Sequence, residues 1–292
     1  MSIERLQAKI RKTKNPIVLD FDMSPELLPP CLLAEEGSFL KAHCRLIFDL
    51  LEEFRGFIPA VKFQFSGFAL QGVDGLTMLS KILDRAKNYG YYVILEVPEA
   101  LSAQRAAMNA QLLFRDENPL YFDGLLLSAY IGSDGIKPYA SVLEETGKSL
   151  FVAVRTGNRS ASEIQDLLTG GRNVYDAMAD VVNRFKASGS IKSGYDRIAI
   201  VAPATSASIA RSLREKYKNL FILVDGYDYP NANAKNCAEA ADKLGHGIVV
   251  CGGTRITAAW QEFGGDGKEY LSCARDYAQR MQKNLARYFT VL

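Results

Sequence analysis

One lysine and several carboxylates stand in the sequence where they could share acid–base chemistry. Lys62 lies between Val61 and Phe63 in an apolar run, and a lysine there needs a partner or a charged ligand because burying an unpaired charge is costly. Glu96 and Asp225 each follow another apolar run. Carboxylates and an ammonium brought together at such positions would be candidates for general acid–base catalysis.

A second stretch has the composition of a phosphate site. In Cys251-Gly252-Gly253-Thr254-Arg255, two glycines would let a phosphate approach backbone N–H groups, and the arginine could bind it with two hydrogen bonds. The alternative is a glycine pair that only turns the chain. Neither histidine suits a general base, and the sequence has no metal-ligand spacing, so we expect no metal and no cofactor.

Short apolar runs must position these residues. They are near-continuous rather than alternating, which is typical of parallel strands covered on both faces. The eight predicted strands are Ile17–Phe21, Val61–Phe65, Tyr92–Glu96, Gly124–Leu127, Leu150–Val154, Ile198–Val201, Phe221–Val224 and Gly247–Cys251.

Helical patterns fill the intervals between the strands. The predicted helices are Leu40–Phe54, Gly75–Asn88, Ala100–Phe114, Ser133–Glu145, Asn173–Ala187, Ser206–Tyr217, Ala232–Leu244 and Asp266–Tyr288. Eight strand–helix units predict an α/β fold, a (β/α)8 TIM barrel that occupies residues 1–292 as a single domain with a short N-terminal surface helix. The alternative, an open doubly wound sheet, lacks a G-x-G-x-x-G motif after the first strand.

In such a barrel the site lies where the strands end. Polar residues at those positions are Asp20, Asp22, Lys62, Glu96, Glu99, Ser128, Tyr130, Arg155, Thr156, Thr205, Asp225 and Arg255. For any one of these residues, the alternative is that it is polar only because the loops that follow the strands are polar.

The bulk composition excludes several classes of protein. Of 292 residues, 48% are hydrophobic and 23% charged, which is typical of a globular protein, and a net charge of +2 does not favour nucleic acid or an anionic membrane. No apolar run approaches the roughly 20 residues of a membrane span. Five cysteines without a C-x-x-C pair predict free thiols in a reducing cytoplasm.

Several motifs together resemble the orotidine 5′-phosphate decarboxylase family in its longer bacterial form. They are IVLDFDMSPELLPP, AVKFQFSGFALQGVDGLTML, SAYIGSDGIKPY, FVAVRTGNRSASEIQDL, IVAPAT and Thr254-Arg255-Ile256. The resemblance implies a TIM barrel that converts orotidine 5′-monophosphate (OMP) to uridine 5′-monophosphate (UMP) and carbon dioxide in pyrimidine synthesis, without a cofactor and as a homodimer. It assigns Asp22 to the ribose, Lys62 to the catalytic lysine of strand two and Arg255 to the phosphate.

The same resemblance exposes departures at the centre of the site. The family's strand-three signature, aspartate-x-lysine-x-x-aspartate, reads Glu96-Val97-Pro98-Glu99-Ala100-Leu101. In the family, the lysine of this signature protonates the carbanion and the second aspartate crosses a dimer interface. The phosphate loop after strand seven reads Asp225-Gly226-Tyr227-Asp228-Tyr229-Pro230, and the asparagine-proline-tyrosine after strand four reads Ser128-Ala129-Tyr130.

By resemblance the chain is a carboxy-lyase, but the sequence leaves open whether it is an enzyme. Three hypotheses follow. The first is a divergent family member with weak or lost decarboxylation, the second an enzyme with altered chemistry on another phosphorylated sugar or nucleotide, and the third a non-catalytic, nucleotide-binding or regulatory partner of an active decarboxylase. The predicted catalytic residues are Lys62 and Glu96, and the predicted ligand-binding residues are Asp22, Arg155, Thr205, Asp225 and Arg255.

Overall fold

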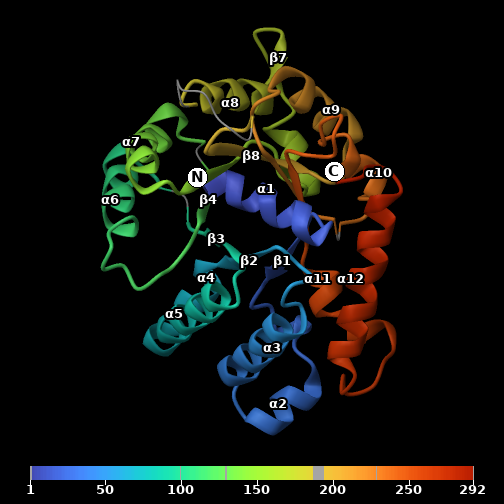
Figure 1. Cartoon of the computed structure of the whole chain (residues 1–292). Coiled ribbons are helices and arrows are strands. Elements are labelled where there is room, and N and C mark those ends of the chain that lie inside the picture. Colours follow the sequence, from blue (N-terminus) through green and yellow to red (C-terminus); the bar gives the residue numbers. More distant parts are fainter. Residues whose placement is uncertain (1, 99, 129, 187–193, 228, 292) are drawn as a thin grey trace.

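The computed structural model describes residues 2–98, 100–128, 130–186, 194–227 and 229–291. Eight parallel strands form a closed barrel in the order β1-β10-β9-β8-β5-β4-β3-β2, with helices around it (Figure 1). The strands are β1 (Ile17–Phe21), β2 (Ala60–Gln64), β3 (Tyr92–Glu96), β4 (Gly124–Ser128), β5 (Ser149–Ala153), β8 (Ile198–Pro203), β9 (Ile222–Asp225) and β10 (Ile248–Gly252). The predicted TIM barrel is therefore confirmed.

Helices and short 3-10 turns connect the strands. The α-helices are α1 (Ser2–Thr13), α2 (Pro30–Glu36), α3 (Phe39–Glu53), α4 (Phe65–Ala69), α5 (Gly72–Asn88), α6 (Ala103–Leu113), α7 (Lys137–Thr146), α8 (Val174–Asn183), α9 (Ala207–Lys216), α10 (Ala234–Ala238), α11 (Thr254–Thr257) and α12 (Tyr270–Ala286). The 3-10 turns are η1 (Pro25–Leu27), η2 (Gly132–Gly135), η3 (Arg159–Glu163) and η4 (Ala259–Glu262).

Two predicted helices differ most from those in the structure, whereas the ends of the others are shifted by at most four residues. The helix predicted over Ser133–Glu145 is divided into η2 and α7, and a proline stands in the first turn of α7, where its missing N–H is tolerated. The helix predicted over Ala232–Leu244 is reduced to the five residues of α10. A two-stranded hairpin, β6 (Leu168–Thr169) with β7 (Arg172–Asn173), was not predicted because two-residue strands leave no periodic signal.

The predicted surface helix at the N-terminus instead closes one end of the barrel. Figure 1 shows α1 lying across the barrel. Ile3, Leu6 and Ile10, spaced so that they share one face of the helix, are at most 1% exposed. They pack in one cluster with inward-facing strand residues such as Tyr92 and Leu223. The predicted helix is present, but its apolar face covers the barrel interior.

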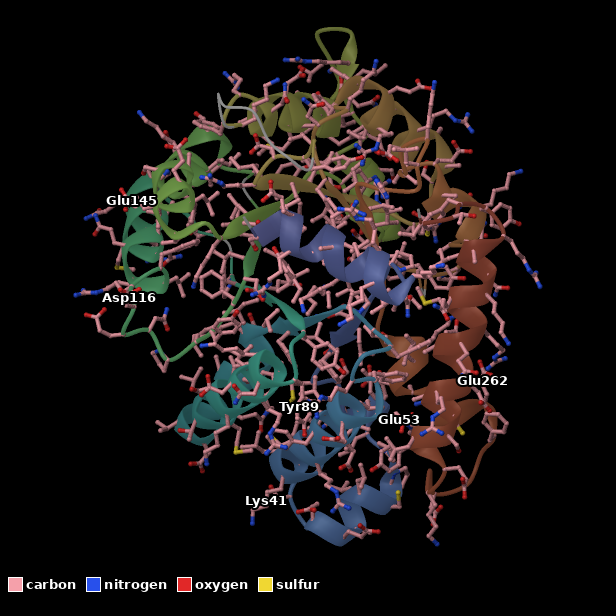
Figure 2. The ribbon with its side chains drawn as sticks, viewed as in Figure 1. Lys41, Glu53, Tyr89, Asp116, Glu145 and Glu262 are labelled. Atoms are coloured by element: carbon pink, nitrogen blue, oxygen red, sulfur yellow. The ribbon has the colours of Figure 1, made fainter. Side chains whose placement is uncertain are left out.

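The larger apolar core lies between the outer faces of the strands and the surrounding helices. It contains residues that alternate with the inward-facing ones, such as Val61 and Phe63 on β2. Outer ion pairs link neighbouring helices; Glu53 on α3 faces α12, where it pairs with Arg275 (Figure 2). No helix within the described ranges is long and apolar enough to cross a bilayer.

Candidate functional site

The carboxyl ends of the strands bring an ammonium and three carboxylates together inside the barrel mouth. Alternate residues of a strand face the same side, so Asp20, Lys62 and Glu96 continue the inward rows of Val18, Ala60 and Ile94. Asp20 and Lys62 are direct neighbours in the register of β1 and β2. Asp225 ends β9 on the other side of the mouth.

Lys62 is the centre of this cluster. Its Nζ atom lies 2.9 Å from Oδ2 of Asp20, 3.1 Å from Oε2 of Glu96 and 3.8 Å from Oδ1 of Asp225. The Lys62 side chain is 5% exposed, whereas those of Glu96 and Asp225 are each 35% exposed. The partner that a lysine in an apolar strand requires is thus a set of three carboxylates.

Burial and neighbouring charges change the acidity of the two inner groups. Burial, reinforced by Asp225 and opposed by Lys62, raises the pKa of Asp20 to about 7. Burial alone would lower the pKa of Lys62, but Asp20 and Asp225 outweigh it and raise that pKa well above its ordinary value. Lys62 is therefore a firmly protonated ammonium at neutral pH, and Asp20 is a carboxyl group that titrates there.

Cys251 is the fifth member of the inner cluster. Its side chain is 2% exposed, and burial together with the negative charge of Asp225 raises the pKa of its thiol well above the ordinary value. Because the thiolate is the reactive form of cysteine, Cys251 is an unreactive group in this site.

The sequence places Asp20 at a strand end, but a role for it in the site was not predicted. Its Oδ1 atom is buried and has no hydrogen-bond partner among the described residues. A Cβ at position 253 would lie 2.7 Å from Cβ of Asp20 and 2.9 Å from its backbone oxygen, so Gly253 allows β1 and the loop after β10 to approach this closely. The available signal was its position two residues after Val18, facing inward like Lys62.

These residues line a cavity of about 280 Å³, which we call the mouth cavity. Its lining consists of Asp20, Asp22, Lys62, Gln64, Glu96, Asp225, Gly226, Tyr229, Cys251, Gly253 and Thr254. Asp22 lies at its rim, where Oδ1 accepts a hydrogen bond of 2.9 Å from the Ser24 hydroxyl. Four of the predicted site residues, Lys62, Glu96, Asp22 and Asp225, are thus brought together here.

Tyr229 forms the outer wall of the mouth cavity. Its ring lies against Gly226, which has a φ of +79°, and against Gly157 of the loop after β5. A Cβ at either glycine would lie within 2.7 Å of the ring, so the two glycines allow one aromatic side chain to connect the loops after β5 and β9.

Arg155 and Thr205 lie outside the described lining of the mouth cavity. Arg155 is buried, and its Nε and Nη2 atoms donate to the two carboxylate oxygens of Asp166 at 3.2 and 2.8 Å. This pair fastens the loop that leaves β5, and the neighbouring Thr156 N–H donates to Gln165 at 2.9 Å. Thr205 is half-buried after β8.

Arg255 faces a second hollow of about 460 Å³, which we call the basic groove. The groove is lined by Tyr227, Ala232, Asn233, Ala234, Lys235, Arg255, Tyr277, Asn284, Arg287 and Tyr288. Three cations and no carboxylate are present among these described lining residues. The groove adjoins the mouth cavity, because Gly226 and Thr254 line the cavity while their successors Tyr227 and Arg255 line the groove.

Pro98 and Leu101, which follow Glu96 in the strand-three segment, are not among the described residues that line the mouth cavity. Pro98 is exposed, and Leu101 is 73% exposed. Glu99, Ala129 and Asp228 lie outside the described residues. No group of three or more His, Cys, Asp or Glu side chains in the described ranges is arranged to hold a metal ion; the mouth carboxylates are grouped around the Lys62 ammonium.

Comparison of sequences finds similarity to curated proteins over nearly the full chain. The orotidine 5′-phosphate decarboxylase of Clostridium acetobutylicum is 27% identical over 288 residues, covering 98% of this chain and 99% of that protein. The enzyme of the same name from Caldicellulosiruptor saccharolyticus is 28% identical over 281 residues, covering 89% and 90%. No protein-family model matches the chain.

Solved structures of OMP decarboxylases have the same fold as this chain. The OMP decarboxylase of Leishmania donovani superposes with a TM-score of 0.74 at 19% identity, covering 98% of this chain and 100% of that one. Orotidine 5′-monophosphate decarboxylase from Methanocaldococcus jannaschii, complexed with the inhibitor BMP, gives 0.61 at 15% identity, covering 91% and 98%.

Proposed function

We propose that this chain binds a phosphorylated, nucleotide-like ligand at the barrel mouth and decarboxylates OMP weakly or not at all. It is a homologue of orotidine 5′-phosphate decarboxylases over nearly its full length. The ligand's phosphate would lie in the basic groove and its ring and sugar in the mouth cavity. The observation that carries the proposal is the charge of the cluster, in which Lys62 is the only cation among the described residues lining the cavity.

Decarboxylation leaves an electron pair on carbon, and positive charge preorganised beside that carbon is the main way to stabilise it. The charge of Lys62 is already compensated by Asp20 at 2.9 Å and Glu96 at 3.1 Å. Pro98, which matches the family's proton-donating lysine, has no proton to give. Loss of a positioned proton donor costs a factor of about 100 to 10,000 in rate, and the described lining of the cavity contains no second cation.

Phosphate binding is supported by the basic groove. Arg255 matches the family's phosphate arginine, and Lys235 and Arg287 lie in the same hollow. Arginine binds phosphate through two parallel hydrogen bonds. The proposed residues for the ring and sugar are Asp22 and Asp225, which line the adjoining cavity.

Binding is tested by thermal shift and calorimetry with UMP and OMP. Ligand binding to the folded state raises stability by RT ln(1 + [L]/Kd), so millimolar nucleotide should raise Tm. Arg255→Ala should weaken the affinity, and the exposed Glu145→Gln variant on the outer side of α7 (Figure 2) serves as the charge-changing control. No shift with either nucleotide, or an unchanged affinity in Arg255→Ala, would refute the phosphate assignment.

A second candidate function is acid–base catalysis on another phosphorylated sugar or nucleotide. The observation that favours it is Asp20, whose pKa of about 7, raised mainly by burial, suits proton transfer near neutral pH. Lys62, Glu96 and Asp225 would be the other acid–base groups. Turnover of a panel of sugar phosphates and nucleotides that disappears in Lys62→Ala would support this function over the first.

We also propose that the chain forms a homodimer through the loops at the barrel mouth. Support comes from apolar side chains exposed after β2 and β3: Leu70 is 85%, Val73 80% and Leu101 73% exposed. Light scattering after size exclusion should give twice the chain mass, and Leu101→Asp should shift it toward the monomer. A wild-type monomer at micromolar concentration would refute this proposal.

A further inference from the structure

The described lining of the mouth cavity carries more negative than positive charge, even when Asp20 holds its proton. Its acidic residues are Asp20, Asp22, Glu96 and Asp225, and its single cation is Lys62. Such an excess inside a hollow of about 280 Å³ acts directly on an entering ligand, because charges interact more strongly where protein replaces water.

Lys62 is surrounded by carboxylates, two of which lie at hydrogen-bond distance from its Nζ atom. An ammonium has three N–H donors, and three carboxylates surround this one: Asp20 and Glu96 at hydrogen-bond distance and Asp225 at 3.8 Å. With its side chain 5% exposed, Lys62 lies beneath its acidic partners. A ligand entering from solvent therefore meets carboxylate oxygens before it meets the cation.

Acceptor atoms at the wall of the cavity are still available. Oε2 of Glu96 accepts from Lys62, while no group in the described part of the chain donates to its Oε1. The Glu96 side chain is 35% exposed, so this oxygen can accept a hydrogen bond from a ligand. Carboxylates that are ionised are acceptors only, and they therefore select hydroxyl, amide N–H or amino groups.

We infer that the end of the ligand entering the mouth cavity carries hydrogen-bond donors and no negative charge, so that the chain prefers nucleotides such as UMP over the carboxylate-bearing OMP. The inference rests on the proposed function, namely that a phosphorylated nucleotide binds with its phosphate in the basic groove. The selected class is a nucleoside or sugar monophosphate whose inner end is neutral or cationic. Cytidine 5′-monophosphate (CMP), with its amino group, belongs to this class.

Because the positive side chains line the basic groove and the negative side chains line the mouth cavity, a single ligand can complement both. The cationic residues Lys235, Arg255 and Arg287 line the groove, whereas the acids line the cavity. A monophosphate with a neutral ring matches this arrangement at both ends. OMP matches it at the phosphate but places a second anion among the carboxylates.

Calorimetry at constant pH and ionic strength tests the inference with UMP, CMP and OMP as probes. UMP and CMP should each bind roughly tenfold or more tightly than OMP, because one added negative charge near uncompensated carboxylates costs at least that factor. Glu96→Gln and Asp225→Asn each remove a negative charge with little change of shape. Each should reduce the ratio of the OMP Kd to the UMP Kd several-fold. The control Glu145→Gln, whose carboxylate is exposed on α7, should leave the ratio unchanged.

The possible results distinguish a failure of the inference from a failure of the proposed function. OMP binding as tightly as UMP, or a preference for UMP that neither Glu96→Gln nor Asp225→Asn reduces, would overturn the inference while leaving nucleotide binding intact. Failure of all three nucleotides to bind would overturn the proposed function and the inference together. A preference for UMP that narrows in both variants would support the inference.

Discussion

The stability of Asp20→Asn relative to wild type is expected to increase as the pH rises from about 5 to 8. Burial first, with Asp225, raises the pKa of Asp20 from 3.8 to about 7. Between these values the folded state holds a proton that the unfolded state has released. The free energy of unfolding of the wild type therefore falls with pH in this window, whereas asparagine does not titrate.

The magnitude follows from the size of the shift. Each pKa unit corresponds to about 1.4 kcal/mol, so a shift from 3.8 to about 7 makes ionised Asp20 unfavourable by about 4 kcal/mol well above pH 7. Integrated from pH 5 to pH 8, the stability of Asp20→Asn relative to wild type should grow by about 2 to 3 kcal/mol. Over the same pH interval, the Tm of Asp20→Asn relative to that of wild type should rise by roughly 5 to 10 °C.

Urea denaturation of both proteins at pH 5 and pH 8, at one ionic strength, measures this change. Asp116→Asn removes an exposed carboxylate on the outer side of the barrel (Figure 2) and should follow the wild-type trend. A stability difference between Asp20→Asn and wild type that is the same at both pH values would refute the protonated state of Asp20.

Three further substitutions test the fold around the site. Arg214→Met should lower the free energy of unfolding by about 2 to 5 kcal/mol, because the buried guanidinium donates to backbone carbonyls that precede and follow β9 in the chain, including those of Leu220 at 2.9 Å and Gly247 at 2.7 Å. Full stability in urea would contradict this role. Leu6→Ala should cost about 2 to 5 kcal/mol, since Leu6 is 0% exposed at the barrel floor, and a surface-like loss below 1 kcal/mol would argue against α1 as a closing element. Gly226→Ala should weaken nucleotide binding, because its Cβ would lie 2.3 Å from the Tyr229 ring. The control Gly264→Ala has a similar φ of +70° but nothing within 4 Å of the added Cβ, and it should leave nucleotide affinity unchanged. Equal affinities in the two variants would count against Tyr229 as a fixed wall of the mouth cavity.

The sequence predicted the barrel because each strand is a short apolar run with a clear end. All eight predicted strands are present, with bounds that differ by at most two residues, as in Ile198–Val201 against Ile198–Pro203. The floor of the barrel could not be predicted from the same pattern. An amphipathic helix such as α1 shows which of its faces is apolar but not which surface that face covers.

The candidate site was predictable only where a residue contradicts its surroundings. Lys62 stands out as a charge in an apolar strand, and its carboxylate partners follow from the strand ends. Arg155 was predicted from its place at a strand end, but its bidentate contact with Asp166 depends on the path of a loop that carries no periodicity. Asp20 became distinctive only through the register of β1 with β2, which the sequence does not specify.

The measurement that tests the central claim most directly is OMP turnover, followed by absorbance beside the Clostridium acetobutylicum relative under the same conditions. The proposal predicts that UMP stabilises the protein in thermal shift while its OMP turnover is about 100-fold or more below that of the relative, as expected for a site without its proton donor. Turnover comparable to that of the relative, abolished by Lys62→Ala, would contradict the claim.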